Sequence, residues 1–182
     1  MDRKPDQIII NDEMENNQDL IKELITLLAN NRWHEEDISE ISETVTFAYN
    51  DPEAYLDTDE GAELTWLLEV DPEGIPAWVI FNELYDVFVV CDKIDELHEQ
   101  IQEVCPEAPI PDFPYGQFPA TPDYFIWLDK LLKGTPPGYQ LISFGDSYGD
   151  NLQGLIVSRA DTERIIHLCK QLNIKASKSM LD

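Results

Sequence analysis

The spacing of apolar residues predicts a helical first third. From about Asp19 to Asn30 apolar side chains recur every three or four positions, which is the period of an amphipathic helix. The same spacing predicts a second helix over residues 36–49, ending before Asp51-Pro52, and a third over residues 64–70. Residues 1–17 are polar apart from one short apolar run, and we interpret them as a flexible arm.

After residue 74 the period changes from helical to extended. Residues 77–81 and 85–91 are rich in aromatic and β-branched side chains, which predicts a β-hairpin followed by a helix that ends at Pro106. A second hairpin is predicted from residues 139–144 and 152–157, which flank a turn rich in Gly, Asp and Asn. The order strand, strand, helix would thus occur twice.

The second unit ends in a well-marked helix. Ser158 stands at the expected N-cap with Asp161 three residues later, and Asn173 suits the left-handed conformation that ends helices. We therefore predict an α+β fold with a mainly antiparallel four-stranded sheet built from two β-hairpin–helix units. Residues 1–182 would form one domain, with a helical part at 18–70 and an α+β core at 76–174. One core should contain Val87, Val89, Leu141, Ile156, Ile165, Leu168 and Leu172.

The segment between the two units is rich in proline. Residues 106–122 hold six prolines and three aromatic residues, a composition that excludes a helix or a central strand. We expect an ordered crossover loop packed on the domain. A helix should resume at Thr121 or Asp123.

Composition indicates a folded protein without a membrane span. The chain has 182 residues, of which 43% are hydrophobic, enough for a sizeable core, and no apolar run is long enough to cross a bilayer. Cys91, Cys105 and Cys169 lie in or beside apolar runs and form no C-x-x-C pair, a pattern typical of buried, reduced thiols. We therefore expect a cytoplasmic protein.

Charge is the global anomaly. The chain has 37 acidic and 12 basic side chains, for a formal net charge of −25, and Lys93 is the only basic residue between Trp33 and Asp129. Such a field repels nucleic acids and anionic lipids and attracts basic proteins. An alternative remains open, in which the acidity serves solubility alone.

No catalytic or metal-binding motif is recognisable. His98-Glu99 begins like the helix motif of zinc proteases, but Gln102 occupies the position of the second histidine. Asp146, Asp150 and Asn151 do not have the spacing of a calcium loop and are residues that turns select. We expect no catalytic residue, no metal and no cofactor.

Two segments resemble known families. Residues 121–128 (TPDYFIWL) and 144–150 (FGDSYGD) are similar to the helix entry and the strand turn of the SUKH superfamily, which includes many bacterial toxin-immunity proteins. The order of elements over residues 122–174 also resembles uncharacterised bacterial domains of unknown function. The first resemblance implies a protein that binds a toxin, and the second implies no activity.

The leading hypothesis is a non-enzymatic, acidic protein-interaction module that binds a basic protein, of the immunity or inhibitor type. Its candidate interface residues are Glu36, Glu40, Glu43, Asp146, Tyr148 and Asp150. Direct binding to nucleic acid or a membrane is not expected. The alternative is a small enzyme or ligand-binding domain with a pocket beside the proline-rich crossover, lined by Phe113, Tyr115, Phe118 and Trp127, with Asp123 or Asp146 at its mouth.

Overall fold

Helices dominate the first hundred residues of the computed structural model, which describes residues 5–105 and 109–178. Five α-helices come first: α1 (Pro5–Ala29), α2 (Glu35–Asn50), α3 (Pro52–Leu56), α4 (Leu67–Val70) and α5 (Ile75–Glu83). Short 3₁₀ helices connect or follow them: η1 (Ala62–Leu64), η2 (Pro72–Gly74) and η3 (Tyr85–Val87). The later helices are α6 (Ile94–Val104), α7 (Thr121–Gly134) and α8 (Thr162–Gln171).

One antiparallel sheet of four strands runs through the molecule. Its strands are β1 (Phe88–Cys91), β2 (Tyr139–Phe144), β3 (Leu152–Ser158) and β4 (Ala176–Ser177), in the spatial order β1-β3-β2-β4. In the register, Phe88 lies opposite Leu155, Leu141 opposite Ile156, and Ser143 opposite Ser177. The predicted α+β class, with a four-stranded antiparallel sheet and a helical N-terminal part, is thus confirmed.

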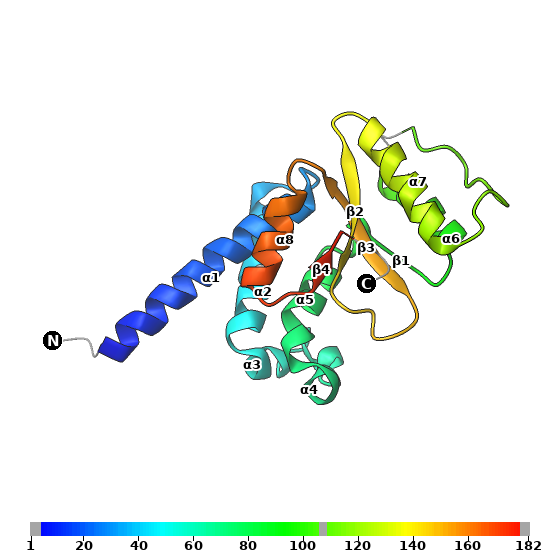
Figure 1. Cartoon of the computed structure of the whole chain (residues 1–182). Helices are drawn as coiled ribbons and strands as arrows, with labels where there is room; N and C mark the ends of the chain where they lie inside the picture. The colour runs from blue at the N-terminus through cyan, green and yellow to red at the C-terminus, as the bar shows by residue number, and fades with distance from the viewer. Residues whose placement is uncertain (1–4, 106–108, 179–182) are drawn as a thin grey trace.

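Helices cover both faces of this sheet (Figure 1): α1, α2, α5 and α8 lie on one side, and α6 and α7 on the other. Side chains of β3 alternate between the sides, because successive residues of a strand point to opposite faces. The sheet therefore separates two cores, and the prediction of one core is wrong. The first core holds Val87, Ile165, Leu168 and Leu172, and the second holds Val89, Leu141 and Ile156.

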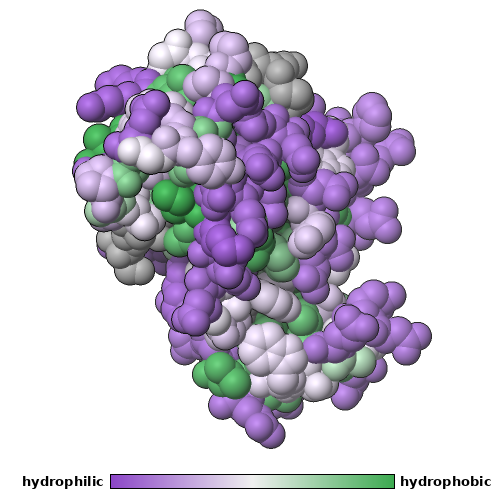
Figure 2. Space-filling model, turned by 90° about the vertical axis from the view of Figure 1, so that its right-hand side faces the viewer, coloured by the Kyte–Doolittle hydropathy of each residue, from purple (hydrophilic) through white to green (hydrophobic). Residues whose placement is uncertain are grey.

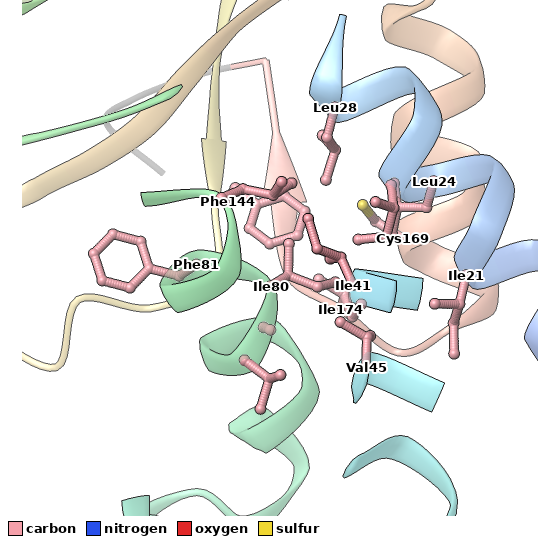
Figure 3. Packing of buried hydrophobic residues seen from close by; sticks show 14 of the residues in the cluster. Ile21, Leu24, Leu28, Ile41, Val45, Ile80, Phe81, Phe144, Cys169 and Ile174 are labelled. Atoms are coloured by element: carbon pink, nitrogen blue, oxygen red, sulfur yellow. The ribbon is translucent and has the colours of Figure 1, made fainter. Parts of the chain in front are cut away.

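The first core is mainly aliphatic and joins elements far apart in the sequence. Figure 3 shows Leu24 of α1, Val45 of α2 and Ile80 of α5 converging with Phe144 of β2 and Cys169 of α8. All five are 0–1% exposed. Removal of this apolar surface from water is the main stabilising term for the helical half of the molecule.

The second core combines aliphatic side chains with a group of aromatic rings and contains a buried histidine. His98 is 0% exposed, and its Nε2 lies 2.7 Å from the carbonyl oxygen of Pro111. Because a carbonyl can only accept, Nε2 carries the proton, and in the neutral ring Nδ1 accepts a hydrogen bond from the Tyr124 hydroxyl at 3.1 Å. Gln102 also donates to the carbonyl of Ile110. These bonds attach the crossover loop to α6.

The first predicted hairpin is wrong. Residues 77–81 belong to α5, which has proline in its first turn and six buried residues among its nine. An apolar run that is buried on all sides has no period from which a strand can be distinguished from a helix. β1 therefore enters the sheet without a hairpin partner, and β4 supplies the fourth strand. Only the second hairpin–helix unit exists as predicted.

Several helix boundaries also differ from those predicted. α1 begins at Pro5, so residues 5–17 of the expected arm are helical, and Figure 1 shows this end of α1 extending beyond the other helices; residues 1–4 lie outside the described part. α8 is capped at Asp161 rather than Ser158, whereas Asn173 has the expected positive φ of 55°. In the described part of the chain, no helix has the length and hydropathy needed to cross a membrane.

Candidate interaction site

The second helix presents an acidic face to solvent. The apolar side of α2 packs on α1 and α5, so Glu36, Glu40 and Glu43 point outward, and all three are exposed. The helix begins at the N-cap His34, whose backbone N–H donates to the Asp37 carboxylate at 3.2 Å. Carboxylates in the first turn of a helix are stabilised by the helix dipole. The structure thus gives these glutamates the exposed position that the sequence predicts.

A groove lies beside this face. We call it the acidic groove; its volume is about 690 Å³, and it is bordered by α2, the α3–η1 segment and the end of α5. Four carboxylates line it, together with three aromatic rings and several smaller side chains. The carboxylates are Asp37, Glu40, Glu60 and Glu83, and the aromatic residues are Trp33, Phe47 and Tyr55.

The aromatic rings give the acidic groove an apolar wall. Phe47 is 42% exposed and meets Tyr55 edge to face, with ring centroids 5.9 Å apart. Tyr55 is only 5% exposed, so its ring is fixed in the wall. Edge-to-face pairs of this kind hold both rings in defined orientations. The groove therefore combines a rigid aromatic surface with negative charge.

Its charges are not neutralised within the described residues. No described lysine or arginine forms an ion pair with Asp37, Glu40, Glu60 or Glu83. Partial desolvation, with repulsion from Glu40 and Glu60, raises the pKa of Glu83. Desolvation also raises the pKa of Tyr55, with smaller contributions from Glu83 and Glu60. A cation placed here would remove these repulsions.

The predicted hairpin-tip residues behave differently. Tyr148 turns inward: its ring packs edge to face on Trp66 and Trp78, at 5.1 and 5.7 Å, and its hydroxyl donates to Asp71 at 3.1 Å. Asp146 accepts the backbone N–H of Tyr148 and lies 3.5 Å from Lys175. Asp150 is exposed. The tip is therefore tied to the α4–α5 region, and the two predicted patches belong to different parts of the surface.

The chain offers little for covalent or metal chemistry in its described part. The three cysteines are buried and form no disulfide, and burial raises the pKa of Cys169 to about 12, so its thiol is not activated. Burial also raises the pKa of Cys91. No cluster of three or more His, Cys, Asp or Glu side chains suited to a metal ion exists among the residues described.

The aromatic residues of the alternative pocket pack mainly against each other. Phe113, Phe118 and Trp127 surround Tyr124 with ring centroids 5.6 to 6.1 Å away, so these rings fill the space between the crossover and α7. Tyr115 is 70% exposed. Asp146, one of the two residues proposed at the mouth of this pocket, is on the β2–β3 turn rather than beside these rings.

Sequence reasoning missed most residues of the acidic groove. Phe47 carried a usable signal, because it lies off the apolar stripe of its helix and so had to be exposed. Glu83 could not be assigned, because the preceding residues were interpreted as a strand. Trp33, Tyr55 and Glu60 come from segments whose relative placement depends on the packing of α2 against α3.

Comparison with known proteins identifies a family but no activity. A family model described as a domain of unknown function, DUF6630, matches residues 20–179, so the chain belongs to this family. The predicted relationship to an uncharacterised domain family is thereby confirmed, whereas the resemblance to SUKH proteins stays a prediction. No curated protein and no solved structure matches the chain.

Proposed function

We propose that this member of the DUF6630 family is a non-enzymatic interaction module that binds a basic segment of a partner protein in its acidic groove. The observation that carries the proposal is the combination of four carboxylates without a described cationic partner and three aromatic rings in one hollow. Lysine and arginine side chains fit such a site, because their charged ends meet carboxylates and cation–π partners while their methylenes cover the rings.

The long-range field favours the same class of partner. A net charge of −25 attracts basic proteins and accelerates their association at low ionic strength. An inhibitor of a cationic protein, such as an immunity protein for a basic toxin, would use both the field and the groove. The proposal includes a cytoplasmic location, suited to three buried cysteines that form no disulfide, and no direct binding to nucleic acid.

A defined peptide tests the proposal. A capped (Lys-Gly)₄ peptide should shift the indole N–H resonance of Trp33 in a two-dimensional NMR spectrum, because Trp33 lines the groove. Trp127, which packs in the second core, is the internal control. Saturable binding should weaken with added salt, because surface charge interactions are screened beyond about 10 Å at 0.1 M salt.

Matched charge variants assign the site. Removing three groove charges with Glu40→Gln, Glu60→Gln and Glu83→Gln should weaken binding about tenfold or more and flatten its salt dependence. The control removes three exposed charges on α6 and α7 with Glu99→Gln, Glu103→Gln and Asp123→Asn, which changes the net charge equally. Equal losses in the two triple variants would show that the peptide responds to net charge only, and the proposal would fail.

A further inference from the structure

A second surface with binding character lies on the α4–α5 side. We call it the aromatic surface; it consists of Trp66, Leu68, Val70, Trp78, Tyr85 and Tyr148. Trp66, Leu68, Val70 and Tyr85 are 39%, 43%, 63% and 62% exposed, and they are four of the seven large apolar side chains exposed among the described residues. Figure 2 shows green and pale atoms toward the lower end of the molecule, the region in which α4 and α5 lie in Figure 1. Exposed apolar side chains that gather on one face are typical of binding surfaces.

The rings form a continuous series. Trp66 and Trp78 meet edge to face at 5.9 Å, and Phe81 links Trp78 at 5.0 Å to Tyr85 at 5.6 Å. Tyr148 of the β2–β3 turn packs on both tryptophans. The series thus presents the edges and faces of several rings along one side of α5.

Hydrogen bonds and close packing fix this arrangement before any partner binds. The Tyr148 hydroxyl and the Lys175 ammonium group both donate to Oδ2 of Asp71, at 3.1 and 3.2 Å. Gly74 makes room for the hydroxyl, since a Cβ at this position would lie 2.1 Å from it. A rigid surface binds at a lower entropic cost than one that must order on binding.

Exposed carboxylates lie in the chain segment that links Trp66 to Trp78. Glu69 and Glu73 are exposed, and neither forms an ion pair with a lysine or arginine in residues 5–105 or 109–178, although Glu73 accepts a hydrogen bond from Asn173 at 2.8 Å. The nearby cation Lys175 is engaged by Asp71 and Asp146. A partner that complements the charge of this surface therefore carries positive charge.

We propose that the aromatic surface binds an arginine-bearing segment of a partner protein, independently of the acidic groove. A guanidinium group is planar and stacks on indole rings while its N–H groups donate to carboxylates, a combination that an ammonium group does not offer. Leu68 and Val70 would contact apolar residues beside the arginine. Phosphate backbones, anionic lipids and a second copy of this acidic chain all carry the wrong charge.

The two surfaces lie on different sides of α5. Glu83 follows Trp78 by five positions, which at about 100° per residue places the two side chains about 140° apart around the helix. Binding at one surface can therefore be measured without occupying the other. The chain provides a reporter for each: Trp66 and Trp78 for the aromatic surface, and Trp33 for the acidic groove.

The test is a titration of the full chain with a capped (Arg-Leu)₃ peptide, followed by the indole N–H resonances. Trp66 and Trp78 should shift saturably, and a peptide with citrulline in place of arginine should bind at least about tenfold more weakly, because it keeps the shape and loses the charge. Trp66→Ala should weaken binding about tenfold or more, as is typical of central aromatic contacts. Tyr115→Ala, which removes an exposed ring on the crossover, is the matched control and should change nothing.

Four results would overturn the inference. Shifts at Trp33 alone would show that the peptide binds in the acidic groove and that the aromatic surface is not a binding site. Equal binding of the citrulline peptide would show that charge is not recognised. Equal or tighter binding of a single-stranded RNA would contradict a protein partner. Shifts at Trp66 that depend on protein concentration without peptide would assign the surface to a second copy of this chain.

Discussion

Replacing Gly74 by alanine tests whether the Tyr148 side chain is held in a fixed position beside Gly74. Gly74 has φ −78° and ψ −11°, a conformation that alanine adopts freely, so the change alone would stabilise the fold by about 0.4 to 1 kcal/mol. The new Cβ, however, would lie 2.1 Å from the Tyr148 hydroxyl oxygen and 3.1 Å from Oδ2 of Asp71. The aspartate side chain can move by a few tenths of an ångström. The tyrosine ring cannot, because Trp66 and Trp78 contact it.

The expected cost follows from the contacts that must break. Loss of the Tyr148–Asp71 hydrogen bond costs about 1 to 2 kcal/mol, and disturbing each ring contact costs about 0.5 to 1.5 kcal/mol. With both ring contacts disturbed and the gain from alanine subtracted, Gly74→Ala should lower the free energy of unfolding by about 1 to 5 kcal/mol. Tyr148→Phe alone should cost about 1 to 2 kcal/mol.

The decisive measurement is the double variant. Phenylalanine lacks the hydroxyl, so in the Tyr148→Phe background Gly74→Ala should be neutral or stabilising by up to about 1 kcal/mol. Urea unfolding of the four proteins, followed by tryptophan fluorescence and circular dichroism, gives the coupling energy. Gly134→Ala is the control, because nothing lies within 4 Å of a Cβ there. If Gly74→Ala costs the same in both backgrounds, Tyr148 does not occupy this position.

Three further predictions concern stability and use the same unfolding assay. Leu168→Ala should cost about 2 to 5 kcal/mol, because its side chain is 0% exposed in the first core, whereas Lys170→Ala should cost under about 0.5 kcal/mol; equal effects would show that the buried face of α8 is wrong. Thr46→Val should stabilise by about 1 kcal/mol, because Oγ1 is buried without a hydrogen-bond partner among the described residues, and a loss would show that it has one. Because the pKa of Glu83 is raised, the folded protein holds this proton more tightly than the unfolded chain, and the carboxylate costs stability as the pH rises above about 4.3. Glu83→Gln should therefore stabilise at pH 7 and lose this effect below about pH 4, and equal effects at both pH values would contradict the assignment.

Periodicity determined which parts of the fold could be predicted. Helices α2 and α7 begin within a residue of the predicted positions, because each has one apolar face and a Pro or Asp signal at an end. Residues 77–81 have no polar face, so their prediction as a strand depended on composition alone. In the structure these residues are buried among other helices and form part of α5. The two-residue strand β4 is too short to have a pattern.

The candidate site also has features that local sequence patterns predict and features that they do not. Exposure of Glu36, Glu40 and Glu43 follows from helical geometry, which the sequence contains. The orientation of Tyr148 does not, because a turn residue is expected to point to solvent, and its inward direction depends on a φ of 52° and on tryptophans about 70 and 80 residues earlier in the chain. Local patterns thus locate charges, whereas ring contacts between distant segments require the structure.

The placement of the acidic residues bears on the alternative that they serve solubility alone. Solubility depends on net charge and on the absence of apolar patches, and it does not require carboxylates to stand beside exposed rings. Here Phe47 shares a groove with four carboxylates, and the exposed rings Trp66 and Tyr85 lie in segments that also carry exposed acids without an ion pair to a described lysine or arginine. A chain optimised only for solubility would not retain exposed rings at these positions, and the ring of Tyr85, which is 62% exposed, could be replaced by a polar residue at a small cost. The presence of these rings among such acids is what a site for a cationic and partly apolar partner requires, and the matched triple variants compare the two explanations at equal net charge.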